Sequence, residues 1–118
     1  MDELIGAYFD AWNEADPDRR RSLVERSIMP DAEFVDPTGR WRGIEGLSQR
    51  IGNYLASAPG KRVAPSSGID AHHDIVRYAW SVVDGDGREV IEGLDVAERA
   101  EDGRLRRVSM FHGPLPTS

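Results

Sequence analysis

Apolar positions three or four apart predict three helices in the first half of the chain. The first helix begins after an N-cap at Asp2 and runs to about residue 14. The second begins at Asp16, which is followed by a proline at the first helical position, and ends near residue 30. The third lies within residues 44–58 and stops at a proline-glycine pair.

After residue 60 the apolar period becomes two, which is typical of strands. Between the second and third helices, residues 33–43 predict two short strands around an Asp-Pro turn. The later strands are expected at residues 61–70, 75–83, 88–99 and 104–112. Helices followed by a meander of long strands indicate an α+β fold, in which a curved antiparallel sheet packs with one face against the helices.

The alternation within residues 88–99 places small side chains around one acid on a face that we expect to be concave and covered by helices. These residues are Ile91, Gly93, Asp95 and Ala97. On the neighbouring strand we expect Arg77 to point inward together with Ile75 and Ala79. An inward Arg77 could pair with Asp95 and keep it ionised.

Composition narrows the possible partners. A chain of 118 residues fits a single domain spanning residues 1–118. The formal net charge of −6 argues against nucleic acid as a partner. No apolar run approaches the roughly 20 residues that a membrane-spanning helix needs, so no membrane partner is expected. The acidic N-terminus is unlike a secretory signal, which makes a cytoplasmic location the default expectation.

Three residues are candidates for chemistry, and each has a structural alternative. Pro37 holds Asp36 on a stiff corner, where its carboxylate is either a turn-former or a positioned base. Tyr8, on an apolar helical face, is a core aromatic or a hydrogen-bond donor. An acid inside a strand at Asp95 must be paired or protonated, which a pair with Arg77 or a catalytic role would each explain.

The order of elements resembles the cone-shaped α+β superfamily that contains nuclear transport factor two, the SnoaL-like polyketide cyclases and ketosteroid isomerase. The segments that carry the resemblance are YFDAWNEAD at Tyr8–Asp16, FVDPTGRWRG at Phe34–Gly43 and LDVAERAEDGRLRRVSMFHG at Leu94–Gly113. It implies a cystatin-like α+β barrel with three N-terminal helices. The superfamily contains enzymes and non-enzymes, so the resemblance marks the fold more firmly than the function.

Similarity to ketosteroid isomerase implies roles for the same three residues. Asp36 matches the catalytic base, while Tyr8 and a protonated Asp95 match the two donors that hold an enolate oxygen. No cofactor is implied, and the ligand is expected to be a small apolar molecule inside the cone. The residues expected to line this pocket are Trp12, Phe34, Trp41, Tyr54, Arg77 and Phe111.

Two other functions remain open from the sequence. In one, the fold is a non-catalytic ligand-binding or dimerising domain with a structural Arg77–Asp95 pair. The other is limonene-epoxide-hydrolase-like chemistry, ranked lowest, for which Arg77 would have to supply an arginine that the family carries where this chain has Gly93. Homodimerisation through the open sheet face is expected from the aliphatic positions Val90, Leu94 and Val96. A metal site is not expected, because adjacent histidines at 72–73 would point to opposite faces of a strand.

Overall fold

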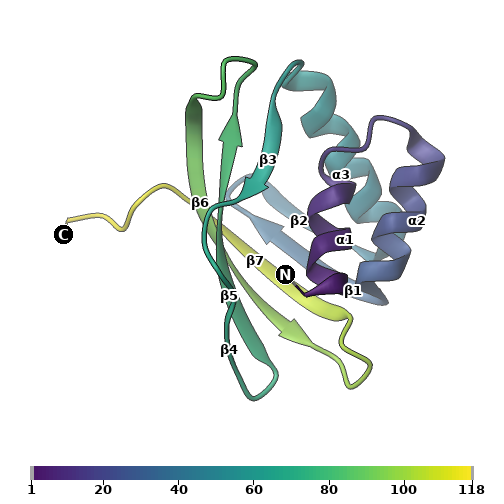
Figure 1. The fold of residues 1–118 in the computed structure, drawn as a ribbon. Helices are drawn as coiled ribbons and strands as arrows, with labels where there is room; N and C mark the ends of the chain where they lie inside the picture. Colours follow the sequence, from purple (N-terminus) through teal and green to yellow (C-terminus); the bar gives the residue numbers. More distant parts are fainter. Residues whose placement is uncertain (1, 118) are drawn as a thin grey trace.

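Three helices and seven strands make up residues 2–117, the part of the chain described by a computed structural model (Figure 1). In chain order the elements are α1 (Glu3–Ala11), α2 (Pro17–Ser27), β1 (Ile28–Asp36), β2 (Gly39–Arg42), α3 (Gly43–Ser57), β3 (Arg62–Pro65), β4 (Asp70–His72), β5 (Ile75–Val83), β6 (Glu89–Arg99) and β7 (Leu105–His112). The α+β class is therefore confirmed.

Local capping explains where the first two helices begin. The Asp2 carboxylate accepts hydrogen bonds from the backbone N–H groups of Leu4 and Ile5, at 2.9 and 3.2 Å. Asp16 accepts from the N–H of Arg19 at 2.9 Å, and Pro17 occupies the first position of α2. Both N-caps agree with the prediction, whereas α1 ends at Ala11, about three residues earlier than expected.

A curved sheet with the strand order β2-β1-β7-β6-β5-β3 lies beside the helices, and β4 pairs with the first residues of β5 while β3 pairs with its last ones. Figure 1 shows the three helices on one side of this sheet. The sheet is mixed rather than wholly antiparallel, because β1 runs parallel to β7. The serine-rich segment expected as one strand forms two, β3 and β4, which both pair with β5.

The inward face of β6 agrees with the prediction, since Gly93, Asp95 and Ala97 are buried. The inward face of β5 does not. Its buried apolar side chains are the even-numbered set Val76, Tyr78, Trp80 and Val82. Arg77 instead lies on the outer face, where its side chain is 65% exposed and its Nε donates to Asp70 at 2.7 Å. The expected inward position of Arg77 is therefore wrong, and the alternative of an Arg77–Asp95 pair is excluded with it.

The hydrophobic core lies between the helices and the concave face of the sheet. Its fully buried side chains come from all three helices and from β1, β5 and β7. The largest of them are Tyr78, Ile5, Ile28, Leu47, Ile51 and Leu105. Within residues 2–117, no helix has both the length and the apolar character needed to cross a membrane.

Candidate functional site

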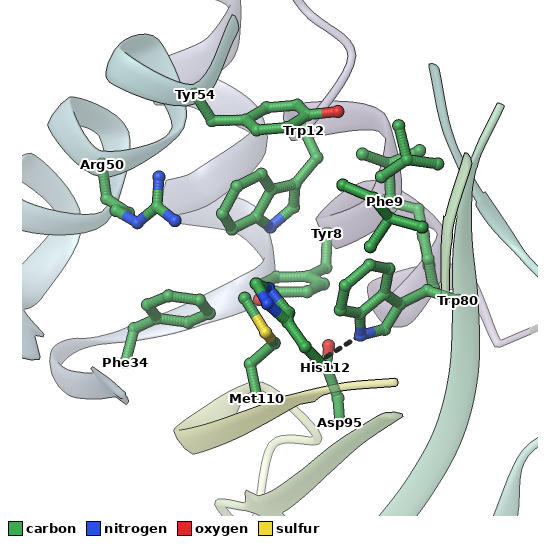
Figure 2. Close-up of a pocket in the computed structure, with 13 residues that line it drawn as sticks. Tyr8, Phe9, Trp12, Phe34, Arg50, Tyr54, Trp80, Asp95, Met110 and His112 are labelled. Carbon is green, nitrogen blue, oxygen red and sulfur yellow. Dashed lines mark hydrogen bonds between the residues drawn. The ribbon is translucent and has the colours of Figure 1, made fainter. Parts of the chain in front are cut away.

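A cavity of about 130 Å³ opens between α1, α3 and the concave face of the sheet (Figure 2). Its walls are mainly aromatic and aliphatic, with a few polar groups among them. The lining residues are Tyr8, Phe9, Trp12, Phe34, Arg50, Tyr54, Val63, Trp80, Val82, Ile91, Asp95, Met110 and His112. An apolar hollow with a few converging polar groups is the usual form of a small-molecule site.

Asp95 is the carboxyl group among the lining residues, and it comes from the middle of β6. The residue is only 3% exposed, with Tyr78 opposite it on β5 and Met110 opposite it on β7. Its Oδ1 atom accepts a hydrogen bond of 3.0 Å from the indole Nε1–H of Trp80, drawn as a dashed line in Figure 2. The residue is thus held on the cavity wall by its cross-strand neighbours.

Burial raises the pKa of Asp95 from its ordinary value of 3.8 to about 7. The Tyr78 hydroxyl and the Trp80 N–H oppose this rise because both favour the charged carboxylate. The Tyr78 hydroxyl acts from nearby but lacks the geometry of a full hydrogen bond. A carboxyl group with this pKa exchanges its proton near neutral pH, as an acid–base catalyst must.

Tyr8 reaches the same cavity from α1. Its side chain is 2% exposed and packs edge to face against Trp12, with ring centroids 6.4 Å apart. Burial, together with the negative charge of Asp95, raises the pKa of Tyr8 well above 10. The phenol therefore keeps its proton at neutral pH and can donate a hydrogen bond to a ligand.

Asp36 does not line the cavity, although it lies at the predicted turn. Its Oδ1 atom accepts hydrogen bonds from the backbone N–H and the hydroxyl of Thr38, at 2.8 and 2.6 Å. Its Oδ2 atom accepts from Nε and Nη2 of Arg50, at 2.9 and 2.8 Å. Burial alone would raise the pKa of Asp36, but the Thr38 and Arg50 contacts outweigh it and hold the pKa below its usual value. Asp36 is therefore both a turn-former and half of an ion pair.

Arg50 is a charged residue of the cavity lining that the sequence analysis did not include. Its guanidinium lies between two indole rings, 5.8 Å from the centroid of Trp12 and 5.1 Å from that of Trp41. The residue lines the cavity, so a positive charge stands at its wall. A signal was available, because Leu47, Arg50 and Tyr54 follow at helical spacing along one stripe of α3, and an arginine on an apolar stripe requires an acid.

Half of the predicted pocket residues line the cavity, namely Trp12, Phe34 and Tyr54. Trp41 does not line the cavity itself, but it packs against Phe34 and Arg50, which do. Phe111 is 58% exposed, because the alternation of β7 turns Met110 and His112 toward the cavity and Phe111 away from it. With Arg77 also on the outer face, these three pocket assignments are wrong.

The donor set of the site suits proton chemistry. Within residues 2–117, no three or more His, Cys, Asp or Glu side chains gather where they could hold a metal ion. The cavity instead brings together a carboxyl group that titrates near neutrality, a protonated phenol and a fixed guanidinium. Such a set can take a proton from carbon and hold the negative charge that develops on oxygen.

Comparison with known proteins now places the chain. A model of the SnoaL-like domain matches residues 5–108. The chain belongs to the SnoaL-like family. A SnoaL-like protein from Agrobacterium tumefaciens, which carries the provisional name of an isomerase, is 31% identical, with a TM-score of 0.87 over 94% of this chain and 95% of that one. A comparison with curated proteins found no match.

More distant SnoaL-like and related structures share the fold. A protein from Sinorhizobium meliloti, provisionally named a polyketide cyclase, is 20% identical, with a TM-score of 0.71 over 93% of this chain and 94% of that one. An NTF2-like protein of unknown function from Exiguobacterium is 18% identical, with a TM-score of 0.74 over 95% and 99%. At these identities the similarity shows the architecture alone.

Proposed function

We propose that this SnoaL-like protein binds a small, largely apolar carbonyl compound and moves a proton at the carbon next to the carbonyl, without a cofactor. The observation that carries the proposal is the Asp95 carboxyl group, buried at the wall of an apolar cavity. An isomerase or a cyclase would each use this step. The provisional names of the Agrobacterium and Sinorhizobium proteins are consistent with those two classes.

In this proposal Asp95 is the base. Its carboxylate takes the α-proton, the C–H electron pair forms a carbon–carbon double bond, and the carbonyl oxygen becomes an enolate. Protonation relieves the cost of holding a charge in the cavity, so the carboxylate is a stronger base than an exposed one. The neutral acid then returns the proton to the same or to another carbon, which balances the reaction.

Tyr8 and Arg50 are suited to the charge that appears on oxygen. Tyr8 donates from a phenol whose raised pKa keeps it protonated. Arg50 supplies a positive charge at the cavity wall, and groups held in place before the reaction stabilise such charge most effectively. Asp36, expected from the resemblance to be the base, is better suited to positioning Arg50, because both of its oxygens are already hydrogen-bonded.

Exchange of α-hydrogen for deuterium tests the proposal without knowledge of the final product. Cyclic ketones are incubated with the protein in D₂O, and the loss of the α-proton signal is followed by NMR. We expect the exchange rate to rise with pH through about 7, as Asp95 loses its proton. Asp95→Asn should slow exchange by about 10²- to 10⁴-fold, the usual contribution of a positioned base.

The matched control is Asp70→Asn. Asp70 lies on β4 with a 65% exposed side chain that pairs with Arg77, outside the cavity lining, so its replacement should leave the exchange rate unchanged. Equal exchange by the Asp95→Asn and wild-type proteins would contradict the proposal. Ligand binding without exchange would instead favour the non-catalytic binding function. Epoxide-hydrolase chemistry, which needs Arg77 beside Asp95, loses its support because Arg77 faces outward.

A further inference from the structure

We infer that Trp80, whose indole packs against the backbone of Gly93, limits the cavity to ligands with a single ring. It also determines where the ligand contacts Asp95. The inference rests on the proposed use of the cavity as a ligand site and adds a substrate class, monocyclic carbonyl compounds. It follows from the packing of two strands and from the volume that this packing leaves.

The indole of Trp80 can lie against β6 only because Gly93 has no side chain. The two residues are directly opposite each other in the β5–β6 pair, so their side-chain positions share one face. A Cβ atom at Gly93 would lie 2.1 Å from Cζ2 of the Trp80 indole and 2.4 Å from the carbonyl oxygen of Phe111. No real side chain tolerates such distances, so the indole rests against the bare backbone of β6.

The packing of the indole against Gly93 directs its N–H toward Asp95. Asp95 lies two residues beyond Gly93 on the same face, and the Trp80 N–H reaches its Oδ1 atom at 3.0 Å. On the other side of Gly93, β7 places His112 in register, and its ring meets the indole nearly perpendicularly at 5.7 Å. Figure 2 shows the indole of Trp80 beside the Asp95 carboxyl group and the His112 ring. Together with the close packing on Gly93, these two contacts orient Trp80 beside the proposed base.

The remaining space is small. The cavity volume of about 130 Å³ is close to that of an engineered apolar cavity of about 150 Å³ that binds benzene in another protein. A second fused ring exceeds this volume, so it must displace a wall residue or extend out through the open side of the cavity, which Ile91 and His112 border. Trp80 is the wall residue beside Asp95 with the largest side chain, so its indole determines how far a ring extends along β6.

Two aryl ketones that differ by one fused ring test the inference. Dissociation constants of acetophenone and 2-acetonaphthone are measured by isothermal titration calorimetry, which does not depend on tryptophan fluorescence. We expect the wild-type protein to prefer acetophenone. Trp80→Phe keeps a ring on Gly93 but shortens it, and should shift the ratio of the two constants at least tenfold toward 2-acetonaphthone.

The control is Phe111→Leu, which shortens an exposed aromatic residue on the outer face and should leave the ratio unchanged. Trp80→Leu serves as a second variant if Trp80→Phe does not fold. A wild-type protein that binds 2-acetonaphthone as tightly as acetophenone, one that binds neither ketone, or an unchanged ratio in the folded Trp80 variants would overturn the inference. Because binding requires no turnover, a protein that selects by ring size but shows no α-exchange would disprove only the proposed catalysis.

Discussion

Replacing Asp95 with asparagine should change the free energy of unfolding, relative to that of the wild type, in a direction that becomes steadily more favourable between pH 5 and pH 8. Asp95 is almost fully buried, and its pKa in the folded protein is about 7 instead of 3.8. Between these two values the folded protein keeps a proton that the unfolded chain has lost. The free energy of unfolding therefore falls as the pH rises from about 4 through 7, and Asp95 adds almost no further change above about pH 8.

The size of the effect follows from the two pKa values. One pH unit is worth about 1.4 kcal/mol, so the whole difference between 3.8 and about 7 corresponds to about 4 kcal/mol. About 3 kcal/mol of this lies between pH 5 and pH 8. Asparagine stays neutral throughout, and its oxygen can still accept a hydrogen bond from the Trp80 N–H. The free energy of unfolding of the variant therefore does not fall with pH on account of residue 95. Its amide hydrogens need new acceptors, a cost that does not change with pH.

Urea denaturation of both proteins at several pH values measures the effect. The quantity of interest is the stability of Asp95→Asn minus that of the wild type, because the contributions of all other titrating groups cancel in the difference. We expect this difference to increase by about 3 kcal/mol from pH 5 to pH 8. A difference that is constant with pH would show that Asp95 is not a buried carboxyl group of raised pKa, and the proposed base would lose its physical basis.

Other predictions concern the surroundings of the site. Arg50→Met leaves the buried Asp36 carboxylate unpaired and should lower the free energy of unfolding by about 3–5 kcal/mol, measured in urea at pH 7; a loss below 1 kcal/mol would contradict the role of the pair. Gly93→Ala should cost at least about 1–3 kcal/mol by overpacking against Trp80, and a fully stable variant would refute the close contact. The chain is predicted to form a homodimer through the outer sheet face. Light scattering should give the wild-type protein a mass of twice 13.1 kDa and the Leu94→Lys variant the mass of a monomer.

Much of the fold was predictable because its causes are local. The N-caps at Asp2 and Asp16 and the spacing of apolar residues define the helices within a few positions. Strands β5, β6 and β7 lie close to their predicted ranges, since alternation and glycine turns mark both ends. The inward face of β6 was also predictable, because small residues surround Asp95 on one face only.

The errors on β5 and β7 have one physical origin. Alternation shows which residues share a face of a strand, but not which of the two faces meets the helices. On β5 the even-numbered positions carry the larger apolar side chains, and their burial turns Arg77 outward. On β7, the face that meets the helices carries Met110 and His112, so Phe111 lies on the outer face.

The sequence by itself determined which groups are available: a carboxyl group in the middle of a strand, a tyrosine on an apolar helix and an acid in a rigid turn. The tertiary structure decided how they are used. Asp36 meets Arg50 only because α3 packs across β1. Among residues 2–117 no cation pairs with Asp95, so burial dominates its pKa. Local periodicity does not encode such distances, because partner choice between charges depends on how separate elements pack together.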